Sequence, residues 1–176
     1  MYPASGDRKR PKRACAATKA AEKFTAYNEI TGKLAMHIRL LMFVTVWLGI
    51  LEISTGRMTC ANAGHEYPAV KHKDGSFEMF KDKHGIAVGA MEGIKYKEYT
   101  IELEKGDKLF VYTDGVPEAT NSDMEMFGTE RMIQALNHES EAGTEKLISN
   151  VRAAVRDFVK DAEQFDDLTM LCIEYK

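Results

Sequence analysis

The sequence is poor in cysteine, and its three cysteines, Cys15, Cys60 and Cys172, show no paired spacing. An odd number of cysteines without such spacing excludes a disulfide framework and favours a reducing compartment. Cys60 and Cys172 lie in apolar segments typical of strands, so we expect both thiols to be buried. The sequence also lacks internal repeats and low-complexity segments.

A long apolar run is missing as well. The longest one covers residues 40–51, which is too short to cross a bilayer as a helix and fits a buried strand. The basic residues at the N-terminus are not followed by the apolar core of a signal peptide. We therefore expect a cytoplasmic protein that does not associate with a membrane.

The chain carries no excess of positive charge, since its net charge is −3. Residues 1–40 hold nine Lys and Arg against three Asp and Glu, whereas residues 41–176 hold fifteen against twenty-four. An acidic body argues against a nucleic-acid-binding domain. Residues 1–17 contain a basic run at 8–13, and we expect them to form a disordered, solvated tail; a targeting patch is the alternative.

Hydrophobic periodicity predicts strands first, then helices, then a last strand. Residues 18–41 are expected to be partly helical. The nearly continuous apolar run at 42–53 predicts a central strand that is covered on both faces. Further strands are expected at 57–63, 70–73, 77–81, 98–104, 108–113 and 168–175, and helices at 129–138 and 144–160, with Thr144 as the N-cap of the second helix. Because hairpin connections dominate, the expected class is α+β with antiparallel sheets.

Carboxylates stand at the ends of two of these strands. Asp114 directly follows an apolar strand and precedes Gly115, while Asp166 and Asp167 come just before the last strand. If the two strands are neighbours, these carboxylates converge, and clustered carboxylates are costly unless a cation lies among them. Oxygen ligands of this kind favour Mg²⁺ or Mn²⁺ over zinc. The alternative from the residues alone is that Asp114 belongs to a turn and the acidic pair to a loop.

Four segments of the chain form a series of motifs. They are Met-Phe-Val-Thr-Val at 42–46, Asn-Ala-Gly-His-Glu-Tyr-Pro at 62–68, Tyr-Thr-Asp-Gly-Val-Pro-Glu-Ala at 112–119 and Phe-Asp-Asp-Leu-Thr at 165–169. In this order the segments resemble the motifs of the bacterial PPM-type, metal-dependent serine/threonine phosphatases. The most similar branch is that of stage II sporulation protein E and the stress-response sigma-factor regulators. On this resemblance, residues 42–176 are the C-terminal part of a PPM phosphatase domain.

The resemblance implies a sandwich of two antiparallel β-sheets flanked by helices. It also implies two Mn²⁺ or Mg²⁺ ions between the sheets, which activate a water for in-line attack on phosphoserine or phosphothreonine. The implied partner is a phosphorylated regulatory protein, by analogy an anti-sigma-factor antagonist.

The resemblance also assigns site residues by position. Asp114 and Asp166 become metal ligands, and Asp167, Gly115 and His65 become candidates for a supporting position behind the ligands. For Asp167 the alternative is a solvated loop acid. For His65 the alternatives are a contact with substrate, a catalytic acid, or a structural position in the turn after a strand.

Two early motifs of the family, Gly-Gly-Asp and Asp-Val-Ser-Gly-Lys-Gly, are not present in these residues. The expected domain is therefore truncated at its N-terminus, lacks its first strands, and has impaired metal binding and activity. Two alternatives are a pseudophosphatase that docks a partner of the sigma-factor pathway without chemistry, and an unrelated α+β domain. Because an incomplete sandwich exposes apolar surface, including parts of Phe43, Val44 and Trp47, we also expect self-association.

Overall fold

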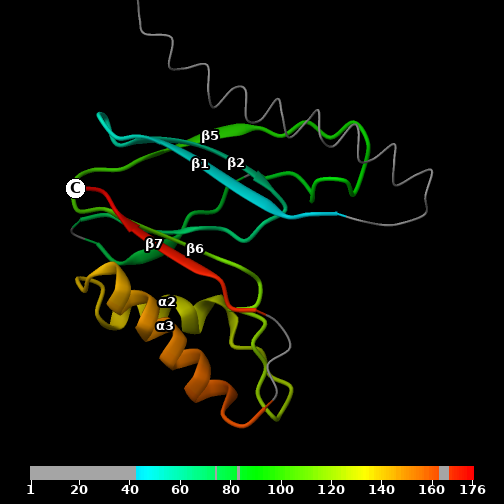
Figure 1. Cartoon of the computed structure of the whole chain (residues 1–176), viewed down its shortest axis with the longest axis vertical. Coiled ribbons are helices and arrows are strands. Elements are labelled where there is room, and N and C mark those ends of the chain that lie inside the picture. The colour runs from blue at the N-terminus through cyan, green and yellow to red at the C-terminus, as the bar shows by residue number, and fades with distance from the viewer. Residues whose placement is uncertain (1–42, 74, 83, 163–166) are drawn as a thin grey trace, which may run out of the picture.

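The computed structural model describes residues 43–73, 75–82, 84–162 and 167–176, and the expectations for residues 1–17 and 18–41 lie outside this part of the chain. The described residues form three layers (Figure 1). A three-stranded sheet stacks on a four-stranded sheet, and two helices cover the other face of the four-stranded sheet. Two antiparallel sheets flanked by helices are the α+β architecture that was expected.

The three-stranded sheet contains β1 (Val46–Glu52), β2 (Arg57–Ala63) and β5 (Glu98–Glu102), in the order β1-β2-β5. The tight turn before β2 needs Gly56, because a Cβ there would lie 1.9 Å from the carbonyl oxygen of Leu103. Although β1 was expected at the centre of a sheet, it is an edge strand among the described residues, and most of its side chains are half-buried. An apolar run indicates that both faces of a strand meet other residues, but it does not indicate whether both edges are paired.

The four-stranded sheet contains β3 (Ala69–Lys71), β4 (Phe77–Met79), β6 (Lys108–Tyr112) and β7 (Met170–Glu174), in the order β4-β3-β6-β7. All of its pairs are antiparallel, and the pairing of Tyr112 with Met170 closes the β6–β7 ladder. The end of β6 therefore lies beside the start of β7, as Figure 1 also shows. This confirms that the strand before Asp114 and the strand after Asp167 are neighbours.

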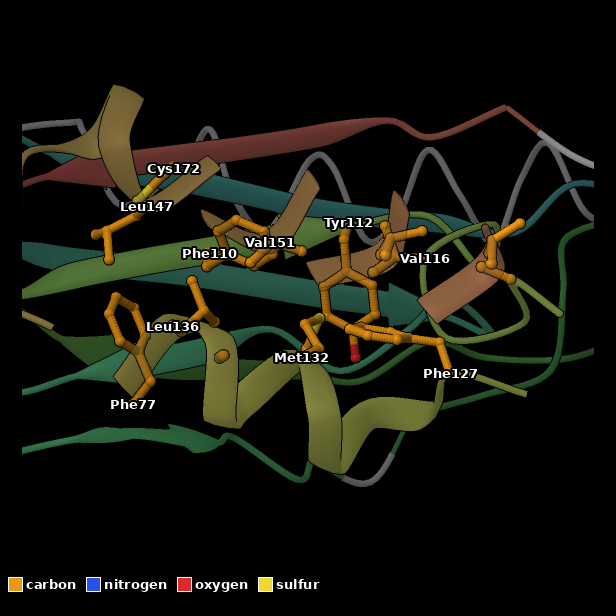
Figure 2. Close-up of a cluster of buried hydrophobic side chains, with 14 residues drawn as sticks. Phe77, Phe110, Tyr112, Val116, Phe127, Met132, Leu136, Leu147, Val151 and Cys172 are labelled. Carbon is orange, nitrogen blue, oxygen red and sulfur yellow. The ribbon is translucent and has the colours of Figure 1, made fainter. Parts of the chain in front are cut away.

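The helices α2 (Gly128–His138) and α3 (Thr144–Val159) pack on this sheet through one apolar stripe each. Figure 2 shows Phe110, Tyr112 and Cys172 of the sheet pointing towards Leu136 and Val151 of the helices. Burial of this apolar surface is the main source of stability for such a layer. A smaller cluster between the two sheets contains Met58, Cys60, Ile101 and Leu109.

The start of α3 differs from expectation by one residue. Gly143 takes the N-cap position and Thr144 is the first helical residue, so no side chain caps this end. Cys60 and Cys172 are buried free thiols, as expected, and burial raises the pKa of Cys60 to about 12. Neither of the two described helices combines the length and the apolar character needed to span a membrane.

Two buried lysines fasten the loop between α2 and α3. Lys71 and Lys108 lie opposite each other on β3 and β6. The Nζ of Lys71 lies 2.9 Å from Oε1 of Glu141, and the Nζ of Lys108 donates to the carbonyl oxygens of Ser140, at 3.0 Å, and Ala142, at 2.9 Å. Buried ammonium groups need such partners, because an unpaired buried charge is strongly destabilising. The loop therefore closes over the ends of the two strands.

This ion pair predicts a pH dependence of stability. The hydrogen bond from Lys71 and its charge lower the pKa of Glu141 below 4.5. A depressed pKa in the folded state contributes stability that is present above the unfolded pKa and is lost as the pH falls through the folded pKa. Glu141→Gln should therefore melt at a lower temperature than the parent at about pH 7, and this difference should shrink below about pH 4. An exposed carboxylate on β4, Glu78, gives the control Glu78→Gln; equal pH profiles for both variants would contradict the account.

Candidate active site

Thr113 joins the loop after β6 to the segment before β7. Its backbone N–H donates to the carbonyl oxygen of Thr169 at 3.0 Å, and its hydroxyl donates to the carbonyl oxygen of Asp167 at 3.2 Å. The N–H of Thr169 donates in turn to the hydroxyl oxygen of Thr113, also at 3.2 Å. These three bonds extend the contact between the strands by one step beyond their last ladder pair. Asp114 and Asp167 are thereby held on adjacent loops.

Asp114 is exposed, whereas the three residues after it are buried. Its Oδ1 accepts a hydrogen bond from the N–H of Gly115 at 3.0 Å, and its carbonyl oxygen accepts one from Glu118 at 2.9 Å. The turn is thus anchored in the core while the carboxylate stays at the surface. Gly115 is buried in this turn and is not one of the described glycines with a positive φ. It supplies the N–H that orients the carboxylate.

Asp166, the second expected ligand, lies outside the described residues. Asp167 is described and exposed, and its carbonyl oxygen is held by Thr113. The metal-ligand position of Asp166 and the supporting position of Asp167 stay predictions.

His65 lies on the segment that carries the chain from the three-stranded to the four-stranded sheet, between the end of β2 and the start of β3. The side chain of Asn62 holds its backbone twice: Oδ1 accepts from the N–H of His65 at 2.8 Å, and Nδ2 donates to its carbonyl oxygen at 3.1 Å. Gly64 has a φ of +72°, and a Cβ there would lie 2.7 Å from the amide nitrogen of Ala87. The ring Nδ1 of His65 lies 3.2 Å from the hydroxyl of Thr45.

The residue after His65 locates this segment relative to β6. Burial, and then the nearby carboxylate of Glu66, raise the pKa of Tyr112 above its ordinary value of 10.0. The strand pairing places the segment in the same way: Ala69 of β3 pairs antiparallel with Phe110 of β6, so the residues before β3 run towards the end of β6. Since Asp114 follows this end of β6, His65 and Asp114 belong to the same end of the sandwich.

A buried carboxylate lies behind this segment. Oδ2 of Asp82 accepts from Nδ2 of Asn62 at 3.4 Å, and its Oδ1 lies 3.1 Å from Nδ1 of His84. The pKa of Tyr99 is raised by burial first and then by a hydrogen bond with Asp82, and the Tyr99 hydroxyl accepts from Nε1 of Trp47 at 2.7 Å. A continuous polar network thus connects β1 and β5 to the turn at His65.

The carboxylate of Asp114 is an oxygen ligand of the kind that suits Mg²⁺ or Mn²⁺ and not softer metals. Within the part of the chain that the structure describes, no group of three or more His, Cys, Asp or Glu residues is close enough to hold a metal ion. The metal-ligand position of Asp114 therefore stays a prediction, like that of Asp166.

Comparison with known protein families decides the lineage. The family model described as stage II sporulation protein E (SpoIIE) matches residues 14–176. The chain belongs to the SpoIIE family. The match begins at residue 14, upstream of the first motif at residues 42–46.

Two curated relatives of the SpoIIE-family chain agree with this assignment. Protein IcfG of Synechocystis sp. is 31% identical over 78% of this chain and 21% of the relative. Phosphoserine phosphatase RsbU of Bacillus subtilis is 27% identical over 77% of this chain and 40% of the relative. The chain thus spans about a fifth of the length of IcfG and two fifths of the length of RsbU.

The fold is also shared with solved structures. The phosphatase domain of SpoIIE from Bacillus subtilis, in a Mn-presoaked form, superposes with a TM-score of 0.63 at 13% identity. The superposition covers 97% of this chain and 76% of the solved one. At this identity the likeness establishes the two-sheet PP2C-type phosphatase fold, and by family the chain is a PPM-type phosphatase domain.

Sequence patterns missed three features of this end of the molecule. Thr113 links two loops, Asn62 clamps His65, and Asp82 is buried behind them. A local signal existed only for Asn62, since Asn followed by Ala-Gly at the end of a strand is typical of a turn. The other two features depend on partners about twenty to fifty residues away.

Proposed function

We propose that the chain carries out metal-dependent hydrolysis of phosphoserine or phosphothreonine on a regulatory protein, with Asp114 and Asp166 as metal ligands. The observation that carries the proposal is the junction of β6 and β7, where Thr113 holds the exposed Asp114 beside the segment that precedes β7. RsbU, the relative described as a phosphoserine phosphatase, supports the choice of substrate class.

The residues of the chain have distinct tasks in this reaction. The N–H of Gly115 keeps Oδ1 of Asp114 in one orientation, which leaves the carboxylate directed by a rigid, core-anchored turn. Thr113 fixes the separation between this turn and the loop of Asp167. When bound, Mn²⁺ or Mg²⁺ would supply Lewis-acid stabilisation of the phosphoryl oxygens and would lower the pKa of a water.

We further propose that the substrate is an anti-sigma-factor antagonist or a similar phosphoprotein, and that the reaction takes place in the cytoplasm. The relationship to RsbU supports the first point, and the buried free thiols of Cys60 and Cys172 support a reducing compartment. The 176 residues alone should be weakly active, because the two early acidic motifs of the family are not among them.

The test is hydrolysis of a phosphoserine peptide with Mn²⁺, compared with the same chain in a chelator. Phosphate release that requires the metal is expected, and it should be measured under single-turnover conditions because the rate is low. Phosphate release that is equal with and without metal would contradict the proposal. Metal binding without hydrolysis, together with retained binding of a phosphoprotein partner, would favour the pseudophosphatase instead.

Self-association remains a prediction of the fold. Phe43, Val44 and Leu171 are exposed apolar residues on or next to strands at the edges of the two described sheets. Such edges favour pairing between chains. Sedimentation velocity should show species larger than a monomer whose fraction rises with concentration; a single monomeric species over a wide concentration range would contradict this.

A further inference from the structure

The crossover between the two sheets is held by one buried amide. The side chain of Asn62, of which 1% is exposed, uses its oxygen and its nitrogen on the two backbone polar groups of His65. A buried amide that satisfies both of these groups fixes the peptide of the partner residue in position and orientation. Gly64 also packs closely against the backbone of Ala87, which leaves no room for a side chain in this turn.

Asn62 is itself held from behind. Its Nδ2 also donates to the carboxylate of Asp82, whose side chain is only 3% exposed. The carboxylate of Asp82 also contacts the side chains of His84 and Tyr99, and the hydroxyl of Tyr99 accepts a hydrogen bond from Trp47. Burying a carboxylate costs free energy, and a turn at the surface does not require a buried carboxylate behind it.

The clamp has a consequence for the imidazole of His65. Its Nδ1 contacts the hydroxyl of Thr45, so Nε2 is the ring nitrogen with which it can meet a ligand. The segment of His65 precedes β3, whose Ala69 pairs antiparallel with Phe110 of β6, so this segment lies towards the end of β6 that leads into the Asp114 turn. The network therefore fixes a histidine at the end of the sandwich where the candidate metal carboxylate lies.

We propose that Asn62 is a positioning residue: it holds His65 so that Nε2 of the imidazole donates a hydrogen bond to the phosphoryl group of the substrate, and Asp82 keeps the amide of Asn62 in the required orientation. The proposal rests on the proposed function, since it assigns a phosphoryl ligand to that site. It makes His65 a residue that touches substrate, while Asn62 and Asp82 act through it.

The chain contains a matched control for this clamp. Asn137 on α2 holds the backbone of Phe77 in the same way, with Oδ1 accepting from the N–H at 2.7 Å and Nδ2 donating to the carbonyl oxygen at 3.1 Å. Phe77 belongs to the core beneath the helices and not to the candidate site. Asn62→Ala and Asn137→Ala should therefore both lower the urea midpoint, because each leaves a backbone N–H without its partner.

Only Asn62→Ala should change catalysis. We expect its single-turnover rate for a phosphoserine peptide to fall about 10- to 100-fold, since a misplacement of about 1 Å has effects of this size, while Asn137→Ala stays within about 2-fold of the parent. In a His65→Ala background the added effect of Asn62→Ala should disappear, because the two residues act as one unit. Equal kinetics of the two asparagine variants, or an undiminished effect in that background, would overturn the proposal.

A second measurement does not depend on hydrolysis. Mn²⁺ alone should broaden the imidazole NMR signals of His65, assigned through His65→Ala, in the parent and in Asn137→Ala, and clearly less in Asn62→Ala. If Asn62→Ala does not fold, Asp82→Asn, which keeps the size of the side chain, takes its place and should show a smaller change in the same direction. Unbroadened His65 signals in the parent overturn the inference even if the chain hydrolyses phosphoserine. The expected broadening in a chain that hydrolyses no phosphoserine contradicts the proposed function and not the position of His65.

Discussion

Replacing Asp114 with asparagine is expected to lower the Mn²⁺-dependent rate of phosphoserine hydrolysis by at least about 100-fold, because the stabilisation supplied by a bound metal is worth several kcal/mol. Asparagine has nearly the same shape, and its side-chain oxygen can still accept the hydrogen bond from Gly115. The fold should therefore be retained, while a neutral amide is a much weaker ligand for a hard divalent cation than a carboxylate. Single-turnover release of phosphate from a labelled peptide measures the effect.

The control for this substitution is Asp123→Asn. Asp123 is also an exposed aspartate on the segment between β6 and α2, so the change of charge and size is the same. Its activity should stay within about 2-fold of the parent. A rate for Asp114→Asn within about 3-fold of the parent, at saturating Mn²⁺ and with unchanged circular dichroism, would show that Asp114 is not a metal ligand.

Replacing Phe110 with alanine is expected to destabilise the domain by about 3–5 kcal/mol, the usual range for a large aromatic residue removed from a core. Phe110 is 0% exposed and lies at the centre of β6, between the helices and the sheet (Figure 2). Since domains of this size are stable by about 5–15 kcal/mol, the loss should be visible as a large fall in the urea midpoint.

Leu171 on the neighbouring strand β7 provides the comparison, because 56% of it is exposed. Leu171→Ala should change the free energy of unfolding of the monomer by less than about 0.5 kcal/mol, as surface substitutions usually do. A loss for Phe110→Ala no larger than that for Leu171→Ala would mean that the core beneath α2 and α3 does not stabilise the domain as described.

Much of the fold could be predicted from local pattern. The alternation of apolar and polar residues at 98–104 and the stripe along 144–160 predicted β5 and α3, because a strand and a helix each impose their own period on burial. The hairpin of β1 and β2 followed from the turn residues that end in Gly56. The neighbouring positions of the Asp114 and Asp167 loops required only that the two apolar strands pair, as they do.

The predictions that differ from the structure concern features that depend on contacts between distant parts of the chain. The apolar run of β1 predicted a central strand, whereas β1 lies at an edge among the described residues, because the position of a strand in a sheet depends on its partners and not on its own residues alone. Lys71 was placed on a strand without a hint of burial, yet it is fully buried, because a distant loop supplies Glu141. Lysine is rarely buried, and only a long-range ion pair reverses that rule.

For the candidate site as well, some features could be predicted from local sequence and others depend on the folded structure. The position of Asp114 directly after a buried strand could be predicted from the sequence, whereas its place as a metal ligand stays a prediction. The clamp of Asn62 on His65 joins residues only three apart, but its meaning depends on Asp82, twenty residues further along. Hydrogen-bond networks of this kind become visible only once the chain is folded, and they are where the structure adds most to the functional account.

The central claim is that the Asp114 turn binds a divalent cation. The most direct test is calorimetric titration of the chain with Mn²⁺, with Asp114→Asn and Asp123→Asn titrated under the same conditions. We predict saturable binding in the parent and in Asp123→Asn, with a strongly reduced heat in Asp114→Asn. Equal binding by all three proteins, or no binding by the parent, would contradict the account.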